Sequence, residues 1–230
     1  MFIFLSESYI NYFSFLNIFN YLTFRTGGAI LTSLFFSLIF GQTIINYLSS
    51  FQPLGQPIRQ DGPERHIIEK AGTPTMGGLL ILSSILVSVL LWARLTNIFI
   101  WITLFSCFSF GLIGFIDDYK KIISQKSRGL TASTRIIFQI LISFVIIFLI
   151  YSYLPESYNT KLNFPFLKNF VFDLGLFFFP FGIFLIIGSA NAVNLTDGLD
   201  GLAIVPVMIV AVSFGFIAYF SGNMIFSEYL

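Results

Sequence analysis

The sequence predicts an all-α membrane protein with six transmembrane helices and an N-terminal interfacial helix. Hydrophobic residues make up 56% of the 230 residues, and the mean hydropathy is +0.87. Only 10% of the residues are charged, which is too few to cover the surface of a water-soluble protein. Several apolar stretches approach the ~20 residues that a helix needs to cross the bilayer core. We therefore expect residues 1–230 to form a single polytopic membrane domain.

The predicted spans follow from the positions of these apolar stretches. The fourth stretch carries no charged residue and is the clearest. The fifth contains Pro180 and the sixth Pro206, which membrane helices tolerate when neighbouring groups satisfy the freed carbonyl. Met1–Phe24 is apolar but is interrupted by Glu7 and three asparagines, so we expect it to lie at the membrane interface. The six predicted spans are Ala29–Leu48, Gly77–Ala93, Ile98–Ile116, Ile136–Leu154, Phe170–Gly188 and Leu202–Tyr219.

The connecting loops alternate between the two sides of the membrane. One side receives Ser49–Met76, Asp117–Arg135 and Ser189–Gly201, which together hold eight of the twelve basic residues. The positive-inside rule makes this side cytoplasmic. The polar motifs of the chain all lie in these three loops, whereas the middles of the predicted spans are almost free of charge. We therefore expect the functional loops at the cytoplasmic interface.

Composition also excludes several classes of protein and site. The net charge of +1 gives no basis for nucleic-acid binding. With one histidine and one cysteine, a zinc site is not expected. No serine–histidine triad, Walker A loop or dinucleotide-binding fingerprint is present. A channel or transporter would be expected to place ionisable residues at mid-membrane depth, and the near absence of charge in the spans favours another class without excluding this one.

The first polar motif is the loop Asp61–Gly78, DGPERHIIEKAGTPTMGG. It brings Lys70, Thr75 and a glycine pair to the start of the second span. A lysine, hydroxyl groups and a helix N-terminus together suit an anion such as phosphate. The alternative is a simple turn with Thr75 as the helix N-cap.

The second motif, GLIGFIDDYKK, places two carboxylates at the cytoplasmic end of the third span. Asp117 and Asp118 would there face the negative end of the helix dipole and repel each other. Such a pair needs a compensating cation, either Lys121 four residues after Asp117 or a divalent metal ion. The alternative is a solvated helix end with weak surface ion pairs.

The third motif, SANAVNLTDGLDGLA, has a polar residue at every third position. These residues are Asn191, Asn194, Asp197 and Asp200, and glycines at 198 and 201 favour a break in the helix. Amide and carboxylate oxygens of this kind suit Mg²⁺, which prefers a few protein oxygens together with substrate phosphates. The alternative is a polar turn. The three motifs together indicate a membrane enzyme that acts on a phosphorylated substrate with Mg²⁺.

The strings GTPTMGG, GFIDDYKK and NAVNLTDGLDGLA, in this order and spacing, closely resemble the phospho-N-acetylmuramoyl-pentapeptide transferase family. This family belongs to the polyprenyl-phosphate sugar-1-phosphate transferase superfamily. FRTGGA near Arg25 and IRQDGPERH add to the resemblance, which runs across all 230 residues. It implies a Mg²⁺-dependent phosphotransferase that converts UDP-N-acetylmuramoyl-pentapeptide and undecaprenyl phosphate into lipid I and UMP.

The resemblance also implies roles for individual residues and a cellular setting. Asp117 would deprotonate or orient the lipid phosphate, Asp118 and Asn194 would bind the metal ion, and Asp197 would support them. Substrate contacts are implied for Lys70, Thr75, Lys121, Asn191 and Asp200. The setting is the bacterial inner membrane, in peptidoglycan synthesis and thus cell shape and division. A homodimer stays open as an alternative to a monomer.

The chain departs from the family pattern at two points. Positions that usually hold a basic residue and then a lysine are Ser133 and Arg135 here, and arginine is a different phosphate ligand from lysine. The family has about ten spans, so these six are expected to be its N-terminal part. We expect no activity from them alone, because a later aspartate of the metal site is missing. An inactive remnant and a small membrane transporter subunit are the alternative functions.

Overall fold

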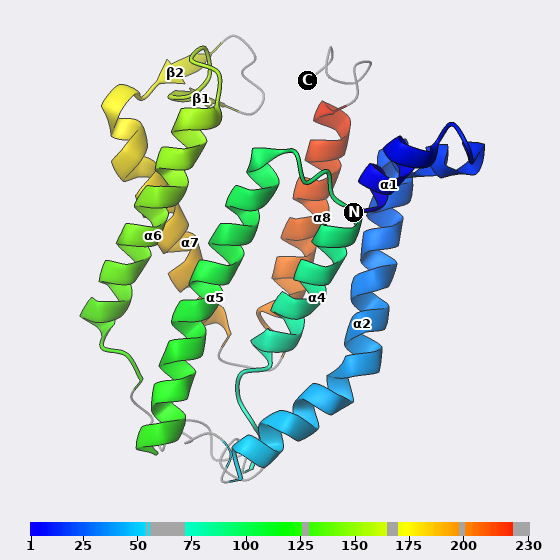
Figure 1. Cartoon of the computed structure of the whole chain (residues 1–230). Helices are drawn as coiled ribbons and strands as arrows, with labels where there is room; N and C mark the ends of the chain where they lie inside the picture. The colour runs from blue at the N-terminus through cyan, green and yellow to red at the C-terminus, as the bar shows by residue number, and fades with distance from the viewer. Residues whose placement is uncertain (54, 56–71, 126–128, 165–169, 198–200, 223–230) are drawn as a thin grey trace. The chain divides into compact units, whose positions relative to one another are not determined.

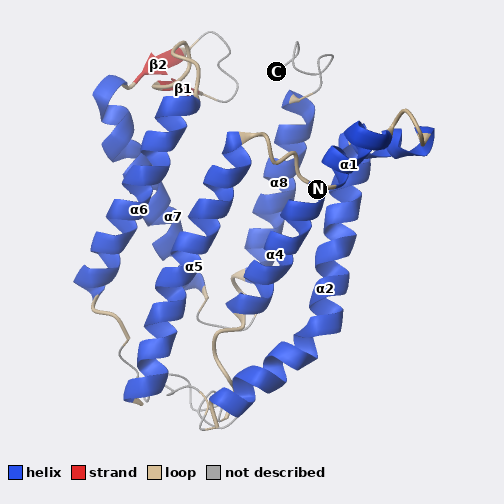
Figure 2. Cartoon of the chain, in the orientation of Figure 1, coloured by secondary structure: helices blue, strands red, loops and turns tan. Residues whose placement is uncertain are grey.

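The computed structural model describes residues 1–53, 55, 72–125, 129–164, 170–197 and 201–222. Helices dominate these ranges, and the only strands described form one short hairpin (Figure 2). The chain divides into two compact units, Met1–Ile142 and Ser143–Leu230, which are described separately. Large apolar side chains remain exposed along the helices, for example Ile39 at 66% and Leu112 at 57%. Such surfaces are stable in lipid rather than in water.

Five helices of the described residues are long and apolar enough to cross a membrane. They are α2 (Leu22–Phe51), α5 (Ile98–Ser124), α6 (Ala132–Tyr153), η2 with α7 (Gly175–Thr196) and α8 (Ile204–Ser221). The predicted second span is also a helix, α4 (Gly78–Trp92), but its 15 residues fall short of that length. A mostly helical membrane protein is thus confirmed.

In the first unit, α4 packs against α2 on one side and α5 on the other (Figure 1). The end of α4 is held by an aromatic cluster of Phe2, Phe19, Phe24 and Trp92, and the Trp92 indole N–H donates to Thr32 Oγ1 at 2.9 Å. The N-terminal ammonium of Met1 donates to the Leu90 carbonyl oxygen at 2.8 Å. It thereby satisfies a carbonyl at the C-terminus of α4, where a positive charge is favourable.

The N-terminal segment differs from the single interfacial helix predicted for Met1–Phe24. It contains a short α-helix, α1 (Phe2–Tyr9), and a 3₁₀ helix, η1 (Ser14–Asn20). Residues 22–24 already belong to α2, which therefore begins seven residues before the predicted span at Ala29. The prediction placed the boundary too late because polar residues close to Arg25 lower the local hydropathy without interrupting the helix.

The second unit contains a feature that the sequence interpretation missed. The predicted fifth span, Phe170–Gly188, begins in the structure as β2 (Val171–Asp173), which pairs antiparallel with β1 (Lys161–Asn163). After η2 (Gly175–Phe177), helix α7 runs over Phe178–Thr196, so the prediction was wrong at both ends. Hydropathy alone does not distinguish an apolar strand from a helix.

Both prolines in the last two helices occupy first-turn positions. Pro180 is the third residue of α7, and Pro206 is the third residue of α8. Backbone N–H groups in the first turn have no intrahelical partner, so proline there breaks no hydrogen bond. At Pro206 no carbonyl therefore needs another partner, whereas Pro180 follows η2, with which α7 forms one continuous helix, so the expectation stays a prediction there.

Candidate active site

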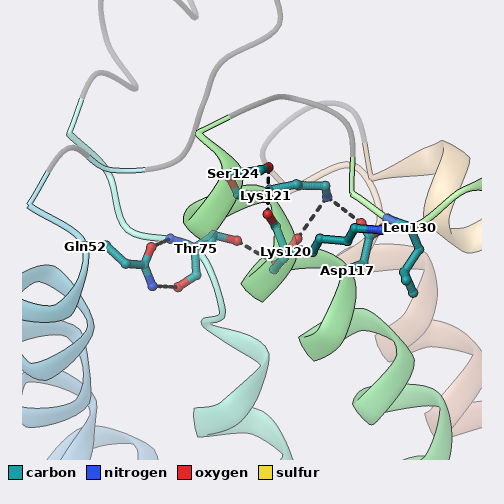
Figure 3. A network of polar contacts seen from close by, with 8 residues as sticks. Gln52, Thr75, Asp117, Lys120, Lys121, Ser124 and Leu130 are labelled. Carbon is teal, nitrogen blue, oxygen red and sulfur yellow. Dashed lines mark hydrogen bonds and ion pairs between the residues drawn. The ribbon is translucent and has the colours of Figure 1, made fainter.

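Two adjacent carboxylates and a lysine form the centre of a polar cluster on α5 (Figure 3). Lys121 Nζ lies 2.6 Å from Asp117 Oδ2 and 3.0 Å from Asp118 Oδ1. Residues three and four apart share one face of a helix, which is why one ammonium reaches both carboxylates. The three side chains are only 13–30% exposed. Of the two candidate cations, Lys121 is the one that the structure shows beside the pair, and a metal ion stays a prediction.

The position of this cluster on α5 differs from the prediction. The helix continues to Ser124, so Asp117 and Asp118 do not stand at its C-terminus as predicted. At 1.5 Å per residue, the ~30 Å hydrocarbon core takes up about 20 residues counted from Ile98. A span of that length counted from Ile98 would end at the acidic pair, which lies in the last turns of α5. The helix backbone gives these side chains a fixed relative geometry.

The segment before α4 supplies a second side chain to the cluster. Thr75 Oγ1 donates to Asp118 Oδ2 at 2.7 Å, although 43 residues separate the two in the sequence. The alternative in which Thr75 caps the helix is wrong, because Gly77 is the N-cap residue and no side chain caps α4. The next residue, Met76, has a positive φ of 71°, a left-handed conformation that costs a non-glycine residue about 1–2 kcal/mol.

Gln52, the residue that follows α2, holds Thr75 in place. Its Oε1 accepts a hydrogen bond from the Thr75 backbone N–H at 2.9 Å, and its Nε2 donates to the Thr75 carbonyl at 3.3 Å. Gln52 is only 3% exposed, so losing these bonds would leave a buried amide unsatisfied. The end of α2 thereby fixes the loop that positions Thr75 against Asp118.

The segment between α5 and α6 contacts the other carboxylate. The Leu130 backbone N–H donates to Asp117 Oδ1 at 2.7 Å, and the charge of Arg135, in the first turn of α6, also acts on Asp117. Gly129 permits this close approach, because a Cβ at that position would lie 2.7 Å from Asp117 Cγ and 2.8 Å from the Asp117 carbonyl oxygen. Within the described residues, Asp117 Oδ1 thus accepts from the Leu130 N–H and Oδ2 contacts Lys121, and a carboxylate oxygen can accept more than one hydrogen bond.

The third motif lies in the second unit and is described by itself. Asn191 and Asn194 both belong to α7, whereas the prediction placed them in a loop starting at Ser189. The Asn191 side chain donates to the Ile187 carbonyl at 2.9 Å. Asp197 is the C-cap residue of α7, and Gly201 has φ +81°, so the break predicted from the glycines is confirmed. Three-residue spacing keeps the two asparagines near one face of α7.

The predicted site residues therefore fall into three groups. The structure brings Thr75, Asp117, Asp118 and Lys121 together within the first unit. Asn191, Asn194 and Asp197 follow one another on α7, and their convergence with the acidic pair stays a prediction. Lys70 and Asp200 lie outside the described residues. The sequence analysis did not predict a role for Gln52 or Gly129.

Comparison with known families agrees with this arrangement. Residues 100–229 match the model of glycosyl transferase family 4, which is more than half of the chain. The chain belongs to glycosyl transferase family 4. Residues 70–82 also match signature 1 of the phospho-N-acetylmuramoyl-pentapeptide transferases, and the chain is a member of that family. The predicted resemblance is confirmed.

The two matches cover the parts that build the cluster of this family 4 transferase. Signature 1 contains Thr75 and the start of α4, and the longer match contains the acidic pair, Lys121 and Leu130. The hydrogen bond between Thr75 and Asp118 therefore links the signature to the longer match in space. The cluster thus joins the two regions that carry the family assignment.

Proposed function

We propose that the chain transfers phospho-N-acetylmuramoyl-pentapeptide from its UDP-linked form to undecaprenyl phosphate, giving lipid I and UMP. The observation that carries this proposal is that Thr75, inside the signature segment, bonds directly to Asp118 of the acidic pair. The family assignment supports phospho-sugar transfer to a polyprenyl phosphate in peptidoglycan synthesis. The choice of UDP-N-acetylmuramoyl-pentapeptide as the donor rests on the match to signature 1.

The cluster suits phosphoryl transfer, in which positioning and charge compensation dominate catalysis. An oxygen of the lipid phosphate attacks the sugar-linked phosphorus of the donor, and the bond to the UMP oxygen breaks. Asp117, fixed by Lys121 and the Leu130 N–H, orients the lipid phosphate and accepts its proton when it arrives protonated. Lys121 contacts a phosphate oxygen and offsets the charge that the two substrates bring together.

The proposal includes Mg²⁺, and the donor set of the cluster fits it. Asp118 uses one acceptor position on each oxygen, for Thr75 and Lys121, so it retains acceptor capacity for a hard cation. In the described part of the chain, no three His, Cys, Asp or Glu residues are grouped to hold a metal ion. Asp118 would therefore share the ion with Asn194 and with phosphate oxygens, and the ion when bound would neutralise charge on the phosphates.

The remaining site residues are assigned to substrate contacts and support. Asp197 would support the metal-binding residues from the end of α7. Thr75 and Asn191 would contact the donor, and so would Lys70 and Asp200, which lie outside the described residues. These assignments follow the family pattern and the oxygen or ammonium chemistry of each side chain.

We also propose the membrane arrangement that places this site. The short helix α4 also crosses the membrane, which brings the number of spans to six. The segments α1 and η1 lie at the outer interface. The acidic pair lies at the cytoplasmic face of the bacterial inner membrane. Basic-residue bias supports this orientation. In a Cys107→Ala background, an impermeant thiol reagent added outside should label Ser157→Cys and not Ser124→Cys. Equal labelling of both would contradict the arrangement.

The reaction is tested by UMP release in nanodiscs with UDP-N-acetylmuramoyl-pentapeptide, undecaprenyl phosphate and Mg²⁺. The assay compares residues 1–230 alone, which the sequence predicts to be inactive, with the chain continued through the later spans of the family. From the continued chain we expect UMP only when all three are present, and far less with UDP-N-acetylglucosamine as donor. Asp118→Asn should lower kcat by about 10²-fold or more, because it removes a carboxylate from the metal site. Asp173→Asn, a control on the hairpin, should leave kcat unchanged. Release of UMP without the lipid phosphate would refute the proposed transfer.

A further inference from the structure

The segment FRTGGA, which the proposed reaction does not use, lies at the start of α2 and beside the end of α4 (Figure 1). A Cβ at Gly28 would lie 2.5 Å from Trp92 Cζ2, so this glycine lets the indole pack directly against α2. The Trp92 indole N–H donates to Thr32 Oγ1 from the same side. Residues three and four apart share one face of a helix. Arg25 therefore lies on the face of α2 that packs against α4.

Arg25 lies at the depth where a membrane protein meets the lipid headgroups. The aromatic cluster around Trp92 marks this level, because tryptophan and other aromatic side chains concentrate at the membrane–water interface. Arg25 precedes Gly28 by three residues, which places it about 4.5 Å nearer the end of the helix. Side chains of a helix also lean toward its N-terminus. The guanidinium group therefore extends beyond the indole ring, toward the headgroups.

Positive charge exceeds negative charge around Arg25. Arg94 follows α4 by two residues, and its like charge acts on Arg25. In the described part of the first unit, Glu7 is the one acidic residue outside the acidic pair of α5. Its Oε1 lies 3.6 Å from Arg94 Nη2, and both side chains are more than half exposed, so this ion pair is weak. The Met1 ammonium, bonded to carbonyl groups at the end of α4, adds a further positive charge.

The Arg25 guanidinium also has an unused hydrogen-bond donor. Its Nε is buried and has no hydrogen-bond partner among the described residues. A buried donor without an acceptor is costly, and the like charge of Arg94 adds repulsion. An anion with several oxygen acceptors would offset both costs. The planar guanidinium group matches the oxygen atoms of a phosphate, to which it can donate two parallel hydrogen bonds.

We propose that Arg25 and Arg94 bind the phosphate of an anionic phospholipid, such as phosphatidylglycerol, in the outer leaflet. Only the headgroup needs a site, because the acyl chains stay in the bilayer. A zwitterionic lipid such as phosphatidylcholine would bring its own cation next to two guanidinium groups, so an anionic headgroup is favoured. This inference is separate from the proposed reaction and uses only the proposed membrane orientation.

Photocrosslinking in nanodiscs tests the site without any need for turnover. Phosphatidylglycerol with a photoreactive group beside its glycerol, diluted into phosphatidylcholine, should crosslink to residues 19–28 and 92–97. Crosslinking should fall about tenfold in Arg25→Gln and also in Arg94→Gln, because each loses a charge-assisted hydrogen bond to the phosphate. Arg25→Lys keeps the charge but loses the planar fork, so it should lose less. The matched control Lys161→Gln removes an exposed positive charge from the hairpin and should leave crosslinking unchanged.

Competition and thermal unfolding provide two independent readouts. Unlabelled phosphatidylglycerol should suppress the crosslink in the parent protein, whereas extra phosphatidylcholine or inorganic phosphate should not. Phosphatidylglycerol should also raise the Tm of the parent and of Lys161→Gln, but not that of Arg25→Gln. If Arg25→Gln does not fold, the competition in the parent and the partial loss in Arg25→Lys decide the matter.

Three results would overturn the inference. Equal competition by phosphatidylcholine would show that the site does not select an anionic lipid. Displacement by inorganic phosphate would show a site for a free anion rather than for a lipid headgroup. Crosslinking that stays unchanged in folded Arg25→Gln and Arg94→Gln proteins would show that the two guanidinium groups do not bind the lipid.

Discussion

Replacing Gly129 with alanine should displace the Asp117 carboxylate without touching any charged residue. The added Cβ would lie 2.7 Å from Asp117 Cγ and 2.8 Å from the Asp117 carbonyl oxygen. Carbon atoms in van der Waals contact are about 3.5–4.0 Å apart, so the carboxylate or the loop must retreat by about 1 Å. The backbone oxygen belongs to α5 and cannot rotate away, so the loop and the carboxylate side chain must absorb the change.

The same displacement should break the hydrogen bond that fixes Asp117. The Leu130 N–H···Oδ1 distance is 2.7 Å, and an added ~1 Å would take it beyond hydrogen-bonding range. A hydrogen bond to a charged group contributes about 1.5–3 kcal/mol, and the Asp117 carboxylate would lose this stabilisation of its position. A misplacement of about 1 Å at a reacting group lowers the rate about 10²-fold. We therefore expect kcat for UMP release to fall by about that factor.

The assay compares Gly129→Ala with Gly27→Ala, whose added Cβ meets nothing within 4 Å. Both variants should keep the helical circular dichroism of the parent, because Gly129 lies outside the helices and Gly27 lies in open space on α2. Only Gly129→Ala should lose turnover. If a folded Gly129→Ala protein stays within about twofold of the parent kcat, Asp117 does not need the Leu130 contact and the positioning argument fails.

Three further predictions follow from other contacts. Gln52→Leu removes both hydrogen bonds to the Thr75 backbone and should lower kcat by about tenfold. The control Gln42→Leu, on the exposed face of α2, should leave kcat unchanged. Equal losses of kcat in the two variants would show that Gln52 has no special role. Lys121→Met leaves two carboxylates without their cation. Calorimetry should therefore show that Mg²⁺ binds about tenfold more tightly, while turnover falls. An unchanged affinity for Mg²⁺ would place the ion elsewhere. Hydrogen bonds from the Thr160 hydroxyl and the Gly175 N–H lower the pKa of Asp173. The hairpin bonds should therefore persist at neutral pH and weaken only as pH falls through that lowered pKa. Hydrogen exchange at the Gly175 amide measures this; exchange in Asp173→Asn should lack the acid transition, and a transition retained in that variant would assign it to another group.

Local patterns in the sequence predicted the local parts of the site. The ion pair between Asp117 and Lys121 follows from a four-residue spacing on one helix, and the structure shows it at 2.6 Å. The break within the third motif followed from its glycines, and α7 ends at Thr196. Such features depend on neighbours in the chain, which is why spacing and residue type were sufficient.

Features that depend on hydropathy or on distant contacts were harder to predict. Hydropathy falls after Ile116, but the helix continues to Ser124 because a helix that leaves the lipid needs only solvated side chains, not apolar ones. The apolar run at Phe170 resembled a span because β2 is equally rich in apolar residues. The Thr75–Asp118 hydrogen bond joins residues that are 43 positions apart and depends on how α4 packs beside α5. A local sequence pattern does not predict that packing.

Phosphorus labelling tests the central claim most directly. A UDP-N-acetylmuramoyl-pentapeptide donor would carry one radiolabel on its sugar-linked phosphate and a second, distinguishable label on its uridine-linked phosphate. After incubation with the protein, undecaprenyl phosphate and Mg²⁺, the first label should move to the lipid fraction and the second should appear in UMP. Substituting Asp118→Asn should slow both transfers by about 10²-fold or more. If both labels remained together on the nucleotide donor, on either side of the membrane, the result would contradict phospho-sugar transfer by this protein.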